Sequence, residues 1–478
     1  MIFKDAALRQ LLVKTRHLAK NKRRKIYLVG GFLRDLLLKR RKPNPDFDFC
    51  LKKGAIAFGR ALSKIIGCGF VILDKDRGYC RLVKKIDGST CTLDFTDFRG
   101  ADLVEDLLHR DFTINAMAMD LDNIFSDRPA GELMIDPYSG RQDLESGIIR
   151  IVHKKNFLDD PLRILRAFSL SAIFGFKIDR QTLKLMQRDK KNISAVSAER
   201  IRDELFKILD TPKAFDCLIE MDKLKILDVI IPEIKIMRGL KQGPYHHLDV
   251  WQHSLETLRQ TEILISELKN SKEIQSYLDE IISSDRKRRS ILKLGAILHD
   301  IGKPAALRHK AGKTIFHGHE RIGRDISEEI IKRLKLSNDD WGVLSKMVFW
   351  HLRPGYLADN QIVSRRAKFR YFRDAGSESI SVLLLSIADQ RSTRGRLTSE
   401  GDRAHHEKIC LALIREHMRQ AKIIKPRPFI NGDTLIRKFK LKPSPLIGKV
   451  LSELEELQAI GKVKSKEEAL RAAKKFIK

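Results

Sequence analysis

Asp46 and Asp48 lie two residues apart in the segment "PDFDF". If this segment is a strand, both carboxylates point to the same face of a sheet. Carboxylates held this close repel each other, and a divalent cation that prefers oxygen ligands, Mg²⁺ or Mn²⁺, removes that cost. Asp94, in the later segment "TLDF", is a candidate third carboxylate. We therefore expect metal-dependent chemistry at Asp46 and Asp48.

A Gly-Gly turn precedes these aspartates in "LVGGFLRD", a pattern typical of strand, turn and helix start. Such a turn points backbone N–H groups and a helix N-terminus at an anion such as a triphosphate. Gly30 and Gly31 would admit the phosphates, Arg34 could reach a phosphate or brace the loop, and Asp35 could cap or brace the helix. The turn would hold phosphates that a metal on the aspartates activates. Alone, the aspartate pair fits a solvated strand edge equally well.

Histidines recur in "DVWQHSLETL", "LGAILHDIGKP", "FHGHERIG" and "VFWHLRP", followed by an aspartate in "SIADQRS". A single histidine on an apolar helix is usually a core residue. Several in succession, including an adjacent His-Asp pair on an apolar helix, indicate a metal site.

The elements that must position these residues differ along the chain. Residues 1 to about 125 alternate strand-like runs with helical patterns, which predicts a small sheet covered by helices. From about residue 150 nearly every segment has helical periodicity, and "SAERIRDELFKILD" opens with a serine cap. Glycines and prolines near residues 239–244 and a polar stretch near residues 391–406 interrupt the helices. We expect an α/β head followed by an all-helical remainder.

The composition favours a polyanionic partner. The 478 residues include 93 Lys and Arg against 62 Asp and Glu, a formal net charge of +31. Nucleic acid is favoured over a membrane surface or an acidic protein. Six scattered cysteines without a C-x-x-C pair predict buried thiols in a reducing compartment. No long apolar run or signal peptide is present, so a cytoplasmic location is expected, although the basic segment "LLVKTRHLAKNKRRK" leaves an organellar presequence open.

Five segments occur in a characteristic order: "LVGGFLRDLLL" with "DFDF", "EDLLHRDFTINAMAMD", "DPYSGRQDLESGIIRIV", "DDPLRILRA" and "ISAVSAERIRDELFKIL". Over about the first 210 residues the chain resembles the class II tRNA nucleotidyltransferase and bacterial poly(A) polymerase family. The resemblance implies a polymerase beta-like nucleotidyltransferase head followed by a helical neck, body and tail. It also implies template-independent addition of nucleotides to RNA 3′ ends.

The resemblance assigns roles to individual residues. Asp46 and Asp48 match the catalytic, metal-binding pair, and Gly30, Gly31, Arg34 and Asp35 match the phosphate-binding loop. The family segment that contacts the sugar and phosphates of the nucleotide is matched by Arg110, Asp111 and Asn115. A hinge-like motif falls on Asp136, Gly140 and Asp143. The amino-acid template for the incoming base falls on Asp160 and Arg163, with Arg166 one helical turn further on.

The chain departs from the family pattern at four places. His109 stands where an arginine is usual, Asp159 where a glutamate is usual, and Ser169-Leu170 where Arg-Phe is frequent. The connection between "TLDFTDFRG" and "EDLLHRDF" is short, whereas complete CCA-adding members carry a longer loop there. In the family a shortened loop accompanies addition of C residues without the final A, so CC addition and complete CCA addition are both retained.

The histidine-rich region resembles the HD phosphohydrolase domain that is fused to some family members. His253, His299, Asp300 and Asp389 match the primary metal ligands, while His319 and His351 match positions for a second metal or a phosphate. His317 is a weaker candidate. A divalent transition metal and a phosphatase or phosphodiesterase activity are implied. Alternatively, this domain binds RNA and its metal is structural or vestigial.

Together these features predict four domains: a head at 1–150, a neck and body at 151–240 for base recognition and RNA binding, an HD domain at 241–395, and an RNA-binding tail at 396–478. The expected enzyme adds C, A or both to tRNA from CTP and ATP and has no membrane partner. Its oligomeric state stays open. Two alternatives are a poly(A) polymerase acting on other RNA ends and an HD phosphohydrolase with a non-catalytic head.

Overall fold

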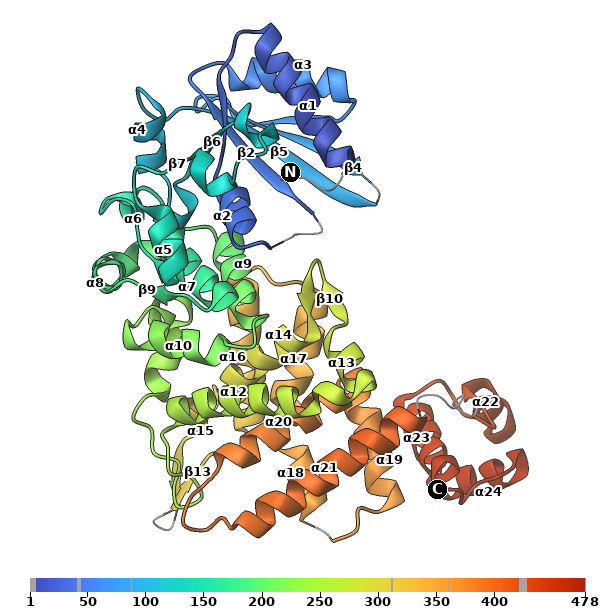
Figure 1. Cartoon of the computed structure of the whole chain (residues 1–478). Helices are drawn as coiled ribbons and strands as arrows, with labels where there is room; N and C mark the ends of the chain where they lie inside the picture. Colours follow the sequence, from blue (N-terminus) through green and yellow to red (C-terminus); the bar gives the residue numbers. More distant parts are fainter. Residues whose placement is uncertain are drawn as a thin grey trace. The chain divides into compact units, whose positions relative to one another are not determined.

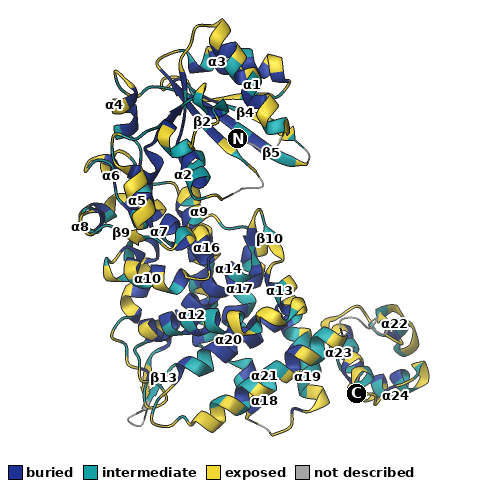
Figure 2. Cartoon of the chain, in the orientation of Figure 1, coloured by how far each residue is buried: buried dark blue, intermediate teal, exposed yellow. Residues whose placement is uncertain are grey.

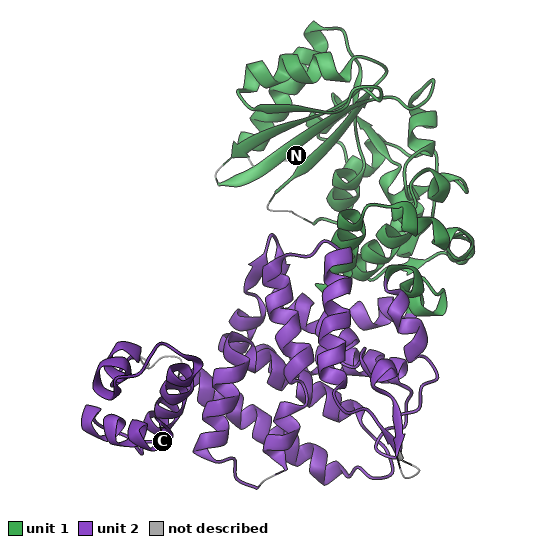
Figure 3. Ribbon diagram, turned by 180° about the vertical axis from the view of Figure 1, so that it is seen from behind, with its two compact units in different colours: residues 1–211, 220–230 green, residues 212–219, 231–478 purple. Residues whose placement is uncertain are grey.

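The computed structural model describes residues 6–40, 44–86, 88–310, 313–359, 361–420 and 428–477. The chain forms two compact units (Figure 1 and Figure 3). Unit 1 comprises residues 1–211 and 220–230, and unit 2 comprises residues 212–219 and 231–478. The large sheet belongs to unit 1, and unit 2 is mainly helical, which confirms the predicted α/β head and helical remainder.

The sheet of unit 1 has seven strands among the described residues, in the order β3-β4-β5-β2-β1-β6-β7. Their bounds are β1 (Ile26–Val29), β2 (Asp46–Leu51), β3 (Gly69–Asp74), β4 (Tyr79–Ile86), β5 (Ser89–Asp97), β6 (Ala118–Asp120) and β7 (Met134–Ile135). Strands β2 and β5 pair in parallel, with Asp48 opposite Asp94. The other neighbouring strands pair antiparallel. This central parallel pair is the part of the sheet that carries the predicted carboxylates.

The two faces of the sheet differ: one packs on the main core of unit 1, and the other packs on a smaller apolar cluster that includes Val29 and Cys50. Phe47 and Phe49 of β2 alternate with the aspartates, and together with Phe95 they are at most 1% exposed. The rings of Phe49 and Phe95 stack with centroids 4.9 Å apart. Helices α1 (Ala6–Asn21) and α3 (Ala55–Ile66) contribute to the same core and lie together in Figure 1. Because side chains alternate along a strand, this packing leaves Asp46 and Asp48 on the opposite face.

Short helices carry the chain from the sheet to the rest of unit 1. They are α2 (Gly31–Leu37), α4 (Leu103–Leu108), η1 (Thr113–Asn115), η2 (Asn123–Phe125), η3 (Ala130–Leu133), α5 (Gly140–Ser146), α6 (Asn156–Asp159), α7 (Leu162–Phe174), α8 (Arg180–Asp189), η4 (Lys190–Ala195), α9 (Ala198–Leu209) and α11 (Leu227–Ile230). The parallel strands β8 (Ile148–Ile149) and β9 (Lys177–Ile178) flank α7. Helix α7 packs on α9, and α10 (Ala214–Lys223) spans residues of both units.

Unit 2 is built around buried helices. Its larger helices are α12 (Val250–Glu267), α14 (Arg288–Leu298), α16 (His319–Arg333), α17 (Asn338–Trp350), α20 (Ser379–Ser392) and α21 (Glu400–Gln420). Its shorter helices are η5 (Pro232–Met237), η6 (Leu268–Asn270), α13 (Lys272–Leu278), α15 (Lys303–Ala306), α18 (Arg353–Ala358), α19 (Arg365–Ala375) and η7 (Gly376–Glu378). Nearly every residue of α14 and α20 is buried (Figure 2). A helix that is apolar on all sides packs inside a domain, and α20 contacts α12, α14, α17 and α21.

Two hairpins depart from the expected all-helical remainder: β10 (Ile281–Ser283) with β11 (Arg286–Lys287), and β12 (Arg308–Lys310) with β13 (Lys313–Ile315). Both are too short for a period-2 pattern to register in the sequence. The last helices, α22 (Gly432–Phe439), α23 (Pro445–Ala459) and α24 (Lys466–Ile477), share a small apolar core. None of the described helices combines the length and apolar content that a bilayer-crossing segment requires.

Candidate nucleotidyl-transfer site and histidine-rich site

Three carboxylates share the face of the sheet opposite the main core. Asp46 and Asp48 lie on β2, and Asp94 lies opposite Asp48 on β5. Burial raises the pKa of Asp48, Asp94 and Asp46 raise it further, and Arg110 lowers it. The Thr92 hydroxyl donates to Asp46 Oδ1 over 2.5 Å. Asp46 and Asp48, two residues apart on one strand, offer oxygen donors of the kind that Mg²⁺ or Mn²⁺ prefers.

The Gly30 turn lies directly against these aspartates. Gly30 has φ of +80°, and a Cβ on it would lie 2.8 Å from Asp48 Oδ2 and 3.0 Å from Arg110 Nη1. Glycine is therefore required both for the backbone conformation and for the close approach. Gly31 is the first residue of α2, so the turn leads directly into the helix start beside Asp48 and Arg110.

Arg34 and Asp35 are buried behind this turn rather than exposed to it. The Arg34 guanidinium donates to Asp35 Oδ1 over 2.9 and 3.0 Å and to Asn115 Oδ1 over 2.7 Å. Its flat face covers the ring of Phe174, with 4.6 Å between Arg34 Cζ and the ring centroid. Arg34 is 4% exposed, and burial lowers its pKa. Of the two roles predicted for Arg34, the geometry favours bracing the loop.

Asn115 extends this network to α7. Its side-chain amide donates to Asp111 Oδ1 over 3.0 Å, and Asp111 Oδ2 lies 2.8 Å from Arg166 Nε. Burial raises the pKa of Asp111, but Arg166 and Asn115 outweigh burial, so the pKa is lowered overall. The segment 111–115 and the first turns of α7 are thus joined by a buried hydrogen bond from Asn115 to Asp111 and by the ion pair of Asp111 with the half-exposed Arg166.

Asp160 and Arg163, which are predicted to recognise the base, form hydrogen bonds with different groups. Asp160 Oδ2 accepts from Arg200 Nη2 over 2.8 Å. Arg163 donates to the carbonyl oxygens of Asn156 and His109 over 3.2 and 2.7 Å. Asp160 precedes α7 and Arg163 lies in its first turn, so the helix start places the two side chains near each other.

The hinge-like motif joins α5 to η1. Asp136 accepts from the N–H groups of Gly140 and Arg141 over 2.7 and 2.9 Å. A Cβ on Gly140 would lie 2.1 Å from the Thr113 carbonyl oxygen, and the Thr113 hydroxyl donates to Asp143 Oδ2 over 2.7 Å. This motif therefore holds the turn that carries Asn115.

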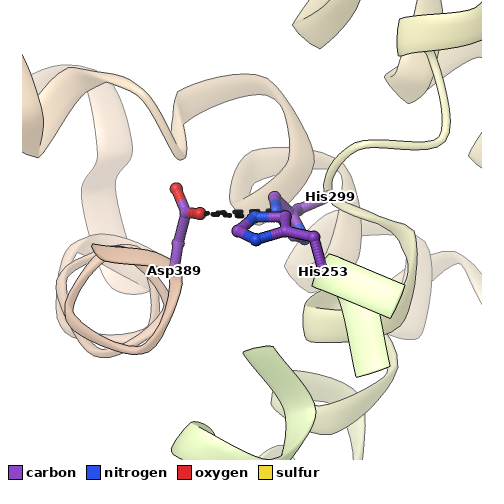
Figure 4. Close-up of side chains that lie close together, drawn as sticks. All are labelled: His253, His299 and Asp389. Atoms are coloured by element: carbon purple, nitrogen blue, oxygen red, sulfur yellow. Dashed lines mark hydrogen bonds and ion pairs between the residues drawn. The ribbon is translucent and has the colours of Figure 1, made fainter. Parts of the chain in front are cut away.

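The predicted histidine-rich set converges in unit 2. His253 comes from α12, His299 ends α14 and is followed by Asp300, and Asp389 comes from α20. His253 Nε2 lies 2.9 Å from Asp389 Oδ1, as Figure 4 shows, and 3.6 Å from Asp300 Oδ2. His299 Nε2 lies 3.1 Å from Asp300 Oδ2. His253, His299 and Asp389 surround one position for a cation, and Asp300 lies beside it.

A second group lies on the other oxygen of Asp300. His319, the first residue of α16, places Nε2 3.3 Å from Asp300 Oδ1, and His351, after α17, places Nε2 3.7 Å from it. Within the described residues two three-ligand groups therefore exist: His253, His299 and Asp389, and Asp300, His319 and His351. His317 belongs to neither of these groups.

The imidazoles of His319 and His351 are oriented as metal ligands. Their Nδ1 atoms lie 2.8 and 2.7 Å from the carbonyl oxygens of Phe316 and Val348. A carbonyl only accepts, so each Nδ1 carries the hydrogen and each neutral ring presents a lone pair at Nε2. The two Nε2 atoms lie 3.2 Å apart. Two lone pairs face each other at this distance favourably only if a proton or a cation lies between them.

Sequence models of four domain families match the chain. They are the poly A polymerase head domain over residues 26–150, the probable RNA and SrmB-binding site of polymerase A over 175–237, the HD domain over 250–394, and a putative tRNA nucleotidyltransferase domain 2 over 399–473. An A-adding tRNA nucleotidyltransferase of Deinococcus radiodurans is 30% identical, with 92% of this chain and 93% of that protein aligned. The chain belongs to the tRNA nucleotidyltransferase family.

A CC-adding tRNA nucleotidyltransferase of Thermus thermophilus is 29% identical to this nucleotidyltransferase, with 92% of this chain and 91% of that protein aligned. A solved structure, the Thermotoga maritima CCA-adding enzyme complexed with tRNA-CCA, shares the fold with a TM-score of 0.65. It is 21% identical and covers 99% of this chain and 96% of its own. The chain is an RNA nucleotidyltransferase with an added HD domain, and family membership implies a divalent metal for nucleotidyl transfer.

The departures of this nucleotidyltransferase from the family pattern have structural counterparts. The Ser169 hydroxyl hydrogen-bonds Glu204, which also accepts from Lys207 over 2.8 Å, so a short side chain satisfies the carboxylate where the family often has arginine. Residues 98–102 alone connect β5 to α4, and Asp102 caps α4 by accepting from the N–H of Glu105. The long loop of complete CCA-adding members is therefore absent between β5 and α4.

Sequence reasoning missed several residues of the nucleotidyltransferase that contact the predicted ones. Arg200 binds Asp160, and Lys303 Nζ lies 2.6 Å from Asp300 Oδ2 and donates to Gln242 Oε1 over 2.6 Å. The spacing of Lys303 in "HDIGKP", three residues after Asp300, could have identified it. His246 places its ring edge-on to His253, with centroids 4.8 Å apart, and nothing in its local sequence indicates this contact.

Proposed function

We propose that this enzyme adds two C residues to tRNA 3′ ends, with CTP as the nucleotide donor. ATP is the other nucleotide that its family accepts. The observation that carries this proposal is the close approach of the Gly30 turn to Asp48 and to Arg110, in a chain of this family. The terminal 3′-hydroxyl of the RNA attacks the α-phosphate of the nucleotide. A P–O bond forms, the bond to pyrophosphate breaks, and the hydroxyl proton is released.

Each part of the site has a role in this reaction. Asp46 and Asp48 would hold Mg²⁺ or Mn²⁺, which lowers the pKa of the attacking hydroxyl and stabilises the leaving pyrophosphate. The N–H groups around Gly30 and Gly31 and the Arg110 guanidinium bind the phosphates. Arg34 and Asp35 brace the loop, and Asp111, Asn115 and Arg166 hold the sugar-side segment in place. The contacts described above support each of these proposed roles.

Base selection falls on Asp160 and Arg163. A carboxylate accepts from the exocyclic amine that C and A carry, and a guanidinium donates to ring acceptors, whereas U and G present a different pattern. Arg200 holds Asp160 until the base arrives, and two main-chain carbonyls hold Arg163. Because Asp160 and Arg163 are held by different partners, each can turn to a nucleotide independently of the other.

The proposed partner is tRNA, and the proposed place of action is the cytoplasm. A formal net charge of +31 fits an RNA whose backbone is bound largely through phosphates and shape. We keep the four-part division at 1–150, 151–240, 241–395 and 396–478 as a proposal, supported by the matched ranges 26–150, 175–237, 250–394 and 399–473.

The short connection of residues 98–102 supports CC addition. The relatives that align over at least 92% of this chain and are at least 26% identical include three named CC-adding, from Thermus thermophilus, Synechocystis and Geobacter sulfurreducens. The second candidate is addition of A alone, which the 30% identity to the Deinococcus radiodurans A-adding enzyme favours.

The direct test of the site is replacement of Asp48 by Asn in the full chain. Asn keeps the shape and removes the charge that holds the metal, so nucleotide addition should fall at least a thousandfold, roughly the loss of an essential transition-state group. Binding of tRNA in a gel-shift assay should stay within about twofold, because Asp48 contacts no phosphate. An Asp48→Asn enzyme that still adds nucleotides would refute the site assignment.

For the second site we propose two divalent transition-metal ions and hydrolysis of a phosphate ester. The six ligands form two groups, Asp300 of the second group places Oδ2 3.1 Å from His299 Nε2 of the first, and mixed imidazole and carboxylate ligands suit such metals. The metals would supply a hydroxide nucleophile and charge stabilisation. Lys303, 2.6 Å from Asp300 Oδ2, places a further positive charge where a phosphate oxygen would bind.

A further inference from the structure

The face of the sheet beyond the catalytic pair is open and has a regular arrangement. Asp48, Asp94, Arg81 and Val71 are register partners in succession across β2, β5, β4 and β3. In the neighbouring row, Asp46 of β2, Thr92 of β5 and Val83 of β4 are register partners in succession. Strands lie about 4.8 Å apart, so Arg81 is roughly 10 Å from Asp48. We call Val71, Arg81 and Val83 the outer strand face.

Asp94 fixes Arg81 on this face. Arg81 donates from Nε to Asp94 Oδ1 and from Nη2 to Oδ2, both over 2.8 Å, and the Tyr79 hydroxyl donates to Oδ2 over 2.6 Å. Asp94 is 6% exposed, whereas the Arg81 side chain is 42% exposed. Both carboxylate oxygens are therefore engaged from the β4 side. This geometry makes Asp94 an anchor for Arg81 rather than an open third metal ligand, the role first considered for it.

This step rests on the proposed function. The direction from which the RNA 3′-hydroxyl attacks the nucleotide indicates that the outer strand face binds the RNA. Gly30 follows β1, which flanks β2 on the side opposite β5. The phosphate-binding turn therefore lies on the β1 side of Asp48. In nucleotidyl transfer the attacking and leaving oxygens are roughly in line. The RNA 3′-hydroxyl must consequently reach Asp48 from the side of β5, β4 and β3.

The chemistry of that side fits an RNA end. Arg81 offers a guanidinium whose geometry is already set by two hydrogen bonds, and such a pre-organised fork suits a phosphate. Val71 and Val83 are 52% and 37% exposed, so they present apolar surface to a sugar or a base. A cation beside apolar surface is how proteins hold single-stranded nucleic acid.

We propose that Arg81, anchored by Asp94 and Tyr79, binds a backbone phosphate near the 3′ end of the RNA. Val71 and Val83 pack against the terminal nucleotide, and together these residues set the 3′-hydroxyl at Asp46 and Asp48. Arg81 is a positioning residue for the RNA and takes no part in nucleotide binding.

The test compares Arg81→Met and Arg81→Lys with Lys85→Met in the full-length enzyme. Lys85 is an exposed residue of the same strand and the same face, four residues further on, so its loss removes equal charge away from the site. Arg81→Met should raise the KM for tRNA or lower kcat/KM for tRNA about ten- to a hundredfold, the loss expected for a charge-assisted hydrogen bond. The KM for CTP should stay within twofold, and Lys85→Met should resemble the parent enzyme.

A second variant separates the anchor from a metal ligand. If Asp94 anchors Arg81, Asp94→Asn reproduces Arg81→Met, and the double variant is no worse than either single variant. If Asp94 ligates the metal, Asp94→Asn is as severe as Asp48→Asn, and its requirement for Mg²⁺ or Mn²⁺ shifts; that result overturns the proposal.

Unchanged tRNA kinetics in Arg81→Met also overturn the proposal. Retained CTP binding in that variant shows that the head is folded. If the parent enzyme extends no tRNA at all, the proposed function fails; if it extends tRNA and Arg81→Met does so equally well, only this inference fails.

Discussion

Asp160 is held by Arg200 at the start of α7, next to an exposed acidic neighbour, Asp159. Because Asp159 and Asp160 are adjacent carboxylates, a substitution of Asp159 is a matched control for the same substitution of Asp160. The Asp160 carboxylate also accepts from the N–H of Leu162 over 3.3 Å. Asp159, the shortened counterpart of a family glutamate, ends α6.

Asp160→Ala should therefore change nucleotide selection. Without the acceptor for the exocyclic amine, kcat/KM for CTP should fall about ten- to a hundredfold, as for a lost hydrogen bond to a charged group. UTP, which lacks that amine, should be used at nearly unchanged efficiency. Single-nucleotide addition with CTP and UTP measures the ratio. Asp159→Ala is the control, and an unaltered ratio of CTP to UTP in Asp160→Ala would contradict the assignment.

At the residue scale, much of the head site was accessible from sequence. Gly30, Asp46 and Asp48 act within nineteen residues of chain, and the strand-turn-helix pattern fixes their relative directions. Arg81 was not accessible, because its relation to Asp48 depends on the order of four strands, which spacing does not encode. Arg200 and His246 were missed for the same reason: each contact joins separate elements.

The element scale is best illustrated by α17. Ser337 and Asp340 form a capping box at its start, and Asp340 also accepts from Arg286 of β11 over 2.7 Å. Ser283 of β10 donates to Asp340 as well, over 2.7 Å. Asp340 is 1% exposed. One carboxylate thus joins a helix start to a hairpin that the sequence did not predict.

Asp340→Asn should destabilise unit 2 by about 3 kcal/mol at neutral pH, because it removes the buried charge that accepts two hydrogen bonds from Arg286. All three tryptophans, Trp251, Trp341 and Trp350, belong to unit 2, so fluorescence during urea unfolding reports on this unit. Asp339→Asn, the exposed neighbour, is the control and should cost less than about 0.5 kcal/mol. Equal stabilities of the two variants would refute this account of α17.

The same pair predicts a pH dependence. Burial raises the pKa of Asp340, but Arg286, Ser283 and Ser337 lower it more, so the folded pKa lies below the ordinary value of 3.8. A lowered folded pKa gives stability that is complete above the unfolded pKa and is lost as the pH falls through the folded pKa. The difference between the parent and Asp340→Asn should be constant above about pH 5 and shrink below about pH 4. A difference that grows on acidification would contradict this sign.

Strand β4 shows why element prediction was incomplete. Its inward residues Cys80 and Leu82 are buried, but Arg81, Lys84 and Lys85 interrupt the apolar pattern, so the segment did not register as a strand. The strand forms because β3 and β5 pair with it on both sides. Helices α14 and α16 of unit 2 were predictable, because the 3.6-residue period extends over ten or more residues in each, whereas α20 is recognised by its continuous apolar run.

At the scale of the whole molecule, the two sites belong to different units. Asp46 and Asp48 lie in unit 1, and all six ligands of the histidine-rich site lie in unit 2. Family resemblance located both sets from the sequence. The convergence of the histidines in two groups, with Asp300 of one group beside His253 and His299 of the other, became visible only when α12, α14, α16, α17 and α20 were packed together.

Asp300→Asn should separate the two activities. Removing the bridging charge should reduce bound transition metal, measured by elemental analysis of the purified protein, from about two ions per chain to less than one, since both groups lose a ligand. Hydrolysis of a bis-p-nitrophenyl phosphate probe should fall accordingly, while tRNA extension stays within twofold. His317→Ala, on the adjacent exposed histidine, should change neither quantity. Loss of tRNA extension in Asp300→Asn would contradict independent sites.

The measurement that tests the central proposal most directly is extension of three tRNA transcripts, ending before the tail, after one C and after two Cs. Each is incubated with CTP, with ATP and with both, and the products are resolved to single nucleotides. We predict that the first transcript gains two Cs, the second gains one, and growth then stops even when ATP is present. Complete CCA addition would contradict the role assigned to the short connection of residues 98–102, extension of the third transcript alone by A would establish the second candidate, and no extension of any transcript would contradict the proposed function itself.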